Sequence, residues 1–155
     1  MQCSMGHQSL SSERAVRWIP PIYPLYKVNF DGATFKKLGA AGLGAVVHDH
    51  TGSVLGALAE RIHLPSSPAV VEALTCRRAL YFAKELSIFE VSVEGDSEVI
   101  IKAILARDMA NPEYGHVISD ILIVANDFRC NFSHVKGKVI QLSIFLPRKL
   151  FLAMS

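Results

Sequence analysis

The sequence predicts a mixed α/β fold around one sheet that has an antiparallel edge. Between residues 26 and 62, three strand-like segments follow one another with short connections, which is typical of an antiparallel meander. The remaining segments extend the order of elements to β-β-β-α-β-α-α-β. The 155 residues, 50% of them hydrophobic, are enough for one domain with its own core.

The first strand is indicated by alternating large apolar side chains at Tyr26, Val28 and Phe30, and Gly32 is expected to end it. Asp31 would then lie at the carboxyl end of this strand. The next two strands are expected at residues 42–49 and 53–62, around a short turn that contains Gly52.

A long helix is predicted from Ser67, as N-cap, and Pro68, as first helical residue, to about Leu86. Its apolar stripe, at helical spacing, includes Glu72, and a carboxylate on a buried stripe needs compensation. The later elements are a strand at 88–94, a helix capped by Asp96 or Ser97, a helix at 115–127 and a strand at 128–135.

Composition and charge exclude several classes of protein. With 16 basic and 14 acidic residues the formal net charge is +2, too small to indicate nucleic-acid binding by itself. The three cysteines form no Cys-x-x-Cys pair, which argues against a disulfide scaffold or a cysteine-rich zinc site. We expect a disordered leader at 1–17, no membrane span and a reducing compartment, nuclear or cytoplasmic.

Three carboxylates occupy positions that this order of elements can bring together. Asp31 ends the first strand, Glu72 lies on the inward helix stripe, and Asp96 ends the fourth strand. Oxygen ligands without nitrogen or sulfur favour Mg²⁺ or Mn²⁺, and two such ions about 4 Å apart can activate a water and stabilise a leaving oxygen. Alternatively, Asp31 is a turn residue and Asp96 a helix cap, which leaves Glu72 unexplained.

A set of ordered motifs resembles a known family. The motifs are Trp18-Ile-Pro-Pro21, Tyr26-Lys-Val-Asn-Phe-Asp-Gly-Ala33, Gly42-Leu-Gly-Ala-Val-Val-His-Asp-His-Thr-Gly52, Val71-Glu-Ala-Leu74, Val93-Glu-Gly-Asp-Ser97 and Phe132-Ser-His-Val135. Together they are similar to the plant ribonuclease H-like domain of the reverse-transcriptase-associated, retroelement-derived type, over residues 18–136.

The resemblance implies a ribonuclease H fold, with a five-stranded mixed sheet in the order 3-2-1-4-5. It implies endonucleolytic cleavage of RNA in RNA–DNA hybrids, with Asp31, Glu72 and Asp96 as catalytic residues that hold two Mg²⁺ (or Mn²⁺) ions. The backbone around Gly32 and Ala33 is expected to contact the hybrid, and His134 is a candidate accessory group or a structural residue. A monomer is expected.

The resemblance stops after Lys136. The fourth metal-site position of the family falls on Ile144, which cannot bind Mg²⁺, and Pro147 would interrupt the last helix of the fold. We hypothesise a frameshift or gene-model error near Gly137, which makes residues 137–155 an aberrant tail. The alternative function is therefore a catalytically inactive, retroelement-derived remnant that binds nucleic acid.

Other candidate groups have simpler interpretations. His48, Asp49 and His50 are expected to form a solvated strand end instead of a metal site. Cys76 is expected to be a small buried hydrophobe, and Arg77 with Arg78 a solvated helix face.

Overall fold

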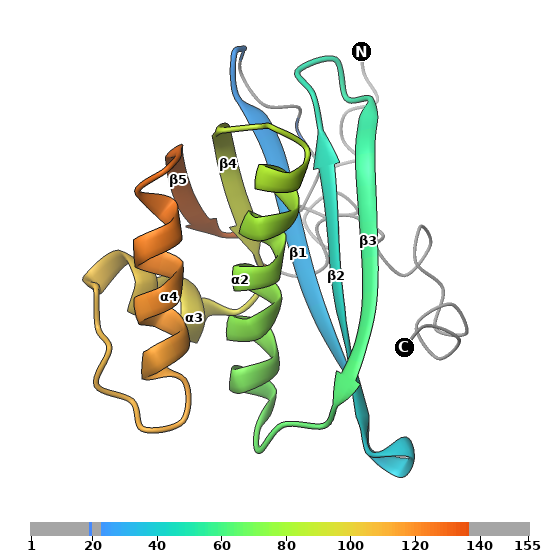
Figure 1. Ribbon diagram of the computed structural model, residues 1–155, viewed down its shortest axis with the longest axis vertical. Helices are drawn as coiled ribbons and strands as arrows, with labels where there is room; N and C mark the ends of the chain where they lie inside the picture. Colours follow the sequence, from blue (N-terminus) through green and yellow to red (C-terminus); the bar gives the residue numbers. More distant parts are fainter. Residues whose placement is uncertain (1–18, 20–22, 137–155) are drawn as a thin grey trace, which may run out of the picture.

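The computed structural model describes residue 19 and residues 23–136, drawn in colour in Figure 1. In chain order the elements are β1 (Tyr26–Phe35), the 3-10 helix η1 (Lys36–Leu38), β2 (Ala40–His48), β3 (Val54–His63), α2 (Pro68–Glu85), β4 (Glu90–Gly95), α3 (Glu98–Ala106), α4 (Gly115–Ala125) and β5 (Arg129–His134). The predicted order of strands and helices is confirmed. The expected leader at 1–17 and the tail at 137–155 lie outside the described residues.

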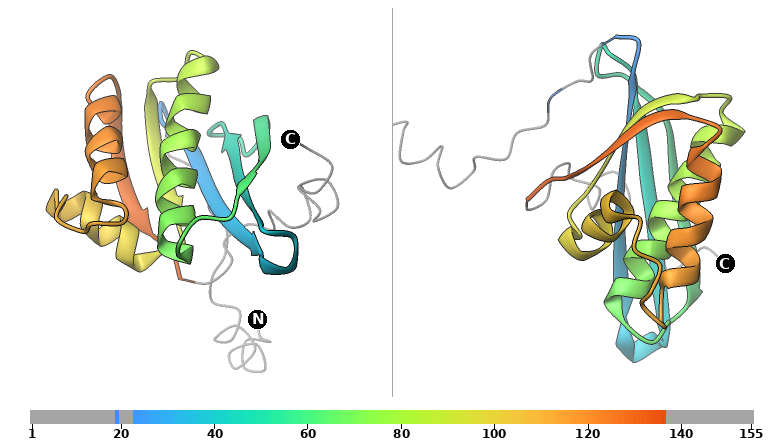
Figure 2. Two further views of the ribbon diagram at one scale, coloured as in Figure 1. Left: turned by 60° about the horizontal axis from the view of Figure 1, so that its bottom comes forward. Right: turned by 90° about the vertical axis from the view of Figure 1, so that its left-hand side faces the viewer.

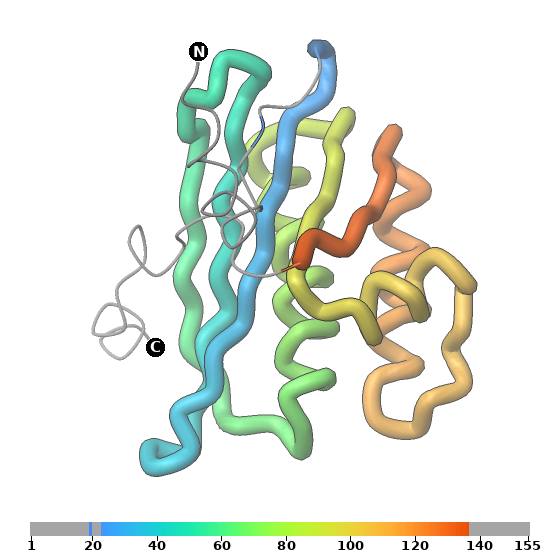
Figure 3. Tube along the Cα trace, turned by 180° about the vertical axis from the view of Figure 1, so that it is seen from behind, coloured from blue at the N-terminus to red at the C-terminus, as the bar shows by residue number. Residues whose placement is uncertain are grey.

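The five strands form one mixed sheet in the order β3-β2-β1-β4-β5, as the resemblance implies. β1 pairs antiparallel with β2 and parallel with β4, so it lies at the centre, as the view from behind also shows (Figure 3). The parallel pairs require crossovers, which the helices supply. α2 and α4 lie side by side on one face of the sheet (Figures 1 and 2).

The main core lies between this face and the helices. Its fully buried members include Val28 of β1, Val93 of β4, Leu80 of α2 and Ile121 of α4. Within the part of the chain that the structure describes, none of the helices combines the length and the apolar content that crossing a bilayer requires.

The first strand is longer than predicted. Gly32 does not end it, because the ladder with β2 continues through Gly32↔Leu43 to Phe35↔Ala40. The glycine serves packing against α2: a Cβ at position 32 would lie 2.8 Å from Val71 Cγ1, closer than real Cβ contacts come. Asp31 therefore lies inside β1, not at its end.

The long helix begins as predicted. Ser67 Oγ accepts a hydrogen bond from the Val70 backbone N–H at 3.4 Å, and Pro68 is the first helical residue. The predicted stripe faces the core: Cys76, Ala79 and Leu80 are fully buried.

The fourth strand begins at Glu90, two residues later than predicted. Ser87 adopts a left-handed φ of 61°, and the Ile88 N–H bonds to the Ala83 carbonyl. Ile88 therefore belongs to the turn that ends α2, although its apolar side chain is buried in the core.

Candidate metal centre

Asp31 is carried by the central strand of the sheet. It lies opposite Gly44 of β2 in the antiparallel ladder and is partly exposed. β1 lies between β2 and β4 in the sheet, and at Asp31 its backbone pairs with β2, because the ladder with β4 ends two residues earlier, at Asn29.

Glu72 reaches the same place from α2. The helix crosses β1 at Gly32, where the absence of a side chain lets the two backbones approach. A Cβ at position 32 would lie 3.4 Å from Glu72 Oε2, which places this carboxylate oxygen directly over the residue that follows Asp31. The inward position predicted for Glu72 is thus confirmed, and the close helix–strand approach explains it.

Asp96 directly follows β4, which ends at Gly95. A Cβ at Gly95 would lie 2.3 Å from Phe30 Cζ, so the glycine leaves room for the buried ring of Phe30 on the neighbouring strand. Ser97, not Asp96, caps α3, since Ser97 Oγ accepts from the Ile100 N–H at 3.4 Å. The side chain of Asp96 is therefore not the cap of this helix.

The structure brings the three predicted acids together. One carboxylate oxygen from each of Asp31, Glu72 and Asp96 can be chosen so that all lie within 4.8 Å of one another, and each residue is partly exposed. Three hard oxygen donors with an opening to solvent fit Mg²⁺ or Mn²⁺ and do not fit a softer ion. The donor chemistry fits a divalent ion, and the role of each acid as ligand stays a prediction.

The charge of Glu72 affects a buried thiol on the same helix, that of Cys76. Burial, and secondly the neighbouring Glu72 carboxylate, raise the pKa of the Cys76 thiol well above its usual range. Cys76 is one helical turn after Glu72 and is fully buried, so the prediction of a small buried hydrophobe is confirmed.

A second polar group lies directly upstream of the acids, and the sequence interpretation missed it. Lys27 of β1 and Glu94 of β4 form a largely buried ion pair with an Nζ–Oε2 distance of 3.2 Å. Asn29 Nδ2 donates to the other Glu94 oxygen, Oε1, at 3.2 Å. The available signal was the alternation of β1, which puts Lys27 and Asn29 on the same face as Asp31.

His134, Gly32 and Ala33, the other residues predicted to belong to the site, lie on the strands around the acids. His134 is exposed and lies opposite Gly95 in the β4–β5 ladder. Since Gly95 directly precedes Asp96, His134 is near the cluster, and its accessory role stays a prediction. Gly32 and Ala33 pair with β2 inside the strand, and their contact with a hybrid stays a prediction too.

The solvated strand end predicted around His48 is wrong in part. His48 is 5% exposed, and burial, then the charge of Lys27, lower its pKa. Asp49 instead organises the turn by accepting hydrogen bonds from Thr51 and Ser53. The β1–β2 ladder reaches His48 and places it opposite Lys27, which is itself only 6% exposed.

The solvated face predicted for Arg77 and Arg78 is also wrong in part. Arg77 pairs with Asp120 of α4 at 2.6 Å, and Arg78 pairs with Glu60 of β3 at 3.1 Å. Neither arginine is fully exposed, since each is engaged in an ion pair with a neighbouring element. These side chains tie the helix to its neighbours and are not available as a basic face.

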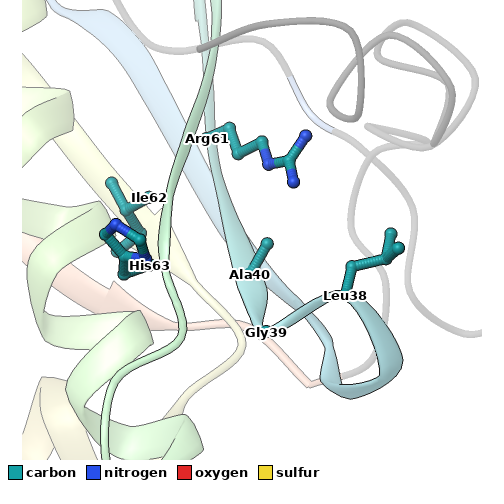
Figure 4. A pocket seen from close by; sticks show the side chains of 6 residues that line it. All are labelled: Leu38, Gly39, Ala40, Arg61, Ile62 and His63. Atoms are coloured by element: carbon teal, nitrogen blue, oxygen red, sulfur yellow. The ribbon is translucent and has the colours of Figure 1, made fainter.

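A small pocket of about 300 Å³ lies at the far end of β2 and β3 (Figure 4). It is lined by Leu38, Gly39, Ala40, Arg61, Ile62 and His63. Figure 4 shows Arg61 and Leu38 projecting on one side of these strands and Ile62 on the other. The lining holds no carboxylate, so this pocket is chemically distinct from the acid cluster.

Comparisons with known proteins agree with the fold. A sequence model described as reverse transcriptase-like matches residues 29–146. An Arabidopsis thaliana protein, named as a candidate ribonuclease H protein, is 38% identical over 89 residues, which are 57% of this chain and 14% of the relative. The chain thus matches only a small part of the length of this curated relative.

Solved structures share the fold. RNase H1 from Halobacterium salinarum superposes with a TM-score of 0.66 at 20% identity, covering 72% of this chain and 85% of that one. LC11-RNase H1, solved in complex with an RNA/DNA hybrid, gives a TM-score of 0.63 at 22% identity, with coverages of 72% and 85%. Since the family match spans most of the chain and the sheet is that of these structures, the chain belongs to the reverse transcriptase-like family and carries a ribonuclease H-like domain.

Proposed function

We propose that this domain is a metal-dependent endonuclease that hydrolyses RNA in RNA–DNA hybrids. The observation that carries the proposal is the convergence of Asp31, Glu72 and Asp96 from three separate elements onto one partly exposed spot. Carboxylates repel one another at such distances, and cations between them relieve the repulsion. A divalent ion between the three acids would compensate their charges, which is why the cluster supports a metal site.

Asp31, Glu72 and Asp96 would hold two Mg²⁺ or Mn²⁺ ions. Bound divalent ions lower the pKa of a water and offset the negative charge on a phosphodiester. The chain itself supplies a rigid base for the acids: Asp31 sits on the central strand, and Glu72 is held against it through Gly32. Cleavage is expected to leave 3′-hydroxyl and 5′-phosphate ends.

The substrate class is supported by two features. LC11-RNase H1, which shares the fold, was solved with an RNA/DNA hybrid. In this chain, Lys36 and Lys37 are exposed on η1, at the end of the same hairpin that carries Asp31. A strand rises about 3.3 Å per residue, so these lysines lie roughly 16 Å beyond Asp31, within reach of a neighbouring part of a duplex backbone. We also propose that the domain derives from a plant retroelement and that it is a monomer.

The test is cleavage of a labelled RNA–DNA hybrid with Mg²⁺ and with Mn²⁺. Asp96→Asn should abolish metal-dependent cleavage, since it removes one charge from the cluster without changing side-chain volume. Asp127→Asn is the matched control, because Asp127 is exposed and pairs with Lys84 far from the cluster. Equal cleavage by wild type and Asp96→Asn would rule out the proposed site.

A second function is favoured by one observation in the sequence: Ile144 stands where the family resemblance expects a fourth ligand. In that case the domain binds hybrids without cleaving them. The two functions separate when binding and cleavage are measured on the same folded sample: retained binding at low salt, with no cleavage in either metal, supports the non-cleaving module.

A further inference from the structure

We propose that Lys27, Asn29 and Glu94 form a positioning network that sets the separation of Asp31 and Asp96. These three residues are called the strand clamp below. The inference rests on the proposed metal centre, and it assigns to that centre three residues that are not themselves candidate ligands.

Both oxygens of the Glu94 carboxylate are engaged by β1. Oε2 lies 3.2 Å from Lys27 Nζ, and Oε1 accepts from Asn29 Nδ2 at 3.2 Å. Lys27 Nζ also donates to the backbone carbonyl of Ile19, which adds a third contact to the same group. The side chains of Lys27 and Glu94 are only 8% and 14% exposed, so water competes little for these contacts.

The clamp lies at the last rung between the two strands that carry the acids. The parallel ladder of β1 and β4 runs from Tyr26↔Val91 to Asn29↔Glu94 and ends there. Side chains two residues apart in a strand lie on the same face. Asp31 follows Asn29 by two residues, and Asp96 follows Glu94 by two, just past the end of β4. The clamp thus lies at the last rung of this ladder, two residues before each of the two acids.

A role in stability alone explains the clamp poorly. A buried ion pair gains little over apolar residues of the same size, because desolvation of both charges offsets their attraction. Its geometry, however, is specific: contacts from two residues of β1 to the two oxygens of one carboxylate favour a single register and spacing of the strand ends. Lys27 also compensates Glu94, which would otherwise add a fourth carboxylate charge close to the cluster.

The experiment measures the dissociation constant of Mn²⁺ for the folded protein by calorimetry, at a temperature well below every melting transition. Glu94→Gln should weaken Mn²⁺ binding about tenfold, the lower end of what loss of a group supporting metal ligands typically costs. Asn29→Ala should produce a smaller loss in the same direction, and it remains available if Glu94→Gln fails to fold.

Two controls separate position from stability. Glu90→Gln makes the same change on the same strand, in the exposed cross-strand pair with Arg129 (3.2 Å), and should leave Mn²⁺ affinity unchanged. Ile121→Val thins the core at α4 and should lower the melting temperature without altering Mn²⁺ affinity.

The outcomes are distinguishable. Wild type that binds no Mn²⁺ overturns the metal centre and the clamp together. Wild type that binds Mn²⁺, while Glu94→Gln and Asn29→Ala bind as well as Glu90→Gln, overturns the clamp alone and leaves the proposed function standing.

Discussion

Replacing Gly95 with alanine tests how the site is packed. A Cβ at this position would lie 2.3 Å from Phe30 Cζ, 2.6 Å from Cε1 and 2.7 Å from Cε2. Ordinary carbon–carbon contact begins near 3.5 Å, so the nearest atom is about 1.2 Å too close. Phe30 is 2% exposed, with core on its other sides, and its ring has little space to move.

Overpacking of this kind typically costs about 1–3 kcal/mol, and the reduced freedom of the unfolded alanine chain offsets up to about 1 kcal/mol of it. Because the overlap of about 1.2 Å is large, we take the upper end of the packing cost, which leaves a net loss of about 2 kcal/mol. For a domain of this size that corresponds to a fall of about 6–10 °C in Tm. Because Asp96 is the next residue, Mn²⁺ affinity should fall as well.

Thermal unfolding followed by circular dichroism gives the Tm, with Gly56→Ala as control. A Cβ at Gly56 would lie 3.0 Å from Phe82 Cζ, on a half-buried ring that can shift, so the control should lose much less. Phe30→Leu removes the obstructing ring atoms, and in that background Gly95→Ala should cost less than in wild type. An equal cost in both backgrounds, or an unchanged Tm, would show that the ring of Phe30 does not limit the space at position 95.

Three further predictions concern single groups. Burial, and secondly the charge of Lys27, lower the pKa of His48 in the folded protein. Its contribution to stability is therefore complete above the unfolded pKa of 6.5 and is lost as the pH falls below that value. Between pH 7.5 and 5, the Tm of wild type should fall more steeply than that of His48→Gln, and parallel slopes would contradict this. Ser97→Ala removes the cap of α3 and should lower the free energy of unfolding by about 1 kcal/mol in urea denaturation, with no change expected if the 3.4 Å contact is immaterial. Burial raises the pKa of the Cys76 and Cys130 thiols, so iodoacetamide should label these two residues quickly only after unfolding. Rapid labelling of Cys76 in the native protein, detected by mass spectrometry, would argue against the packing of α2.

Local signals in the sequence predicted the elements well where a few neighbouring residues decide the outcome. Ser67 and Pro68 begin α2 as expected, because an N-cap and its helix are adjacent in the chain. The apolar stripe of α2 likewise predicts that Glu72 faces inward. The prediction was wrong where a residue serves packing between distant elements. Gly32 suggests the end of a strand, but β1 continues past it, and the glycine is needed because α2 packs closely against the strand there.

By itself, the sequence determined the order of strands and helices, the three acids and their family pattern, because periodicity, caps and motifs act over a few residues. The sequence also predicted that the three acids meet, and the tertiary structure adds that their oxygens lie within 4.8 Å of one another. Only the tertiary structure shows that His48 is buried and that Lys27 and Asn29 hold Glu94. The physical reason is the parallel pairing of β1 with β4. It joins residues as far apart in the chain as Asn29 and Glu94, and no local rule specifies which side chains then face each other.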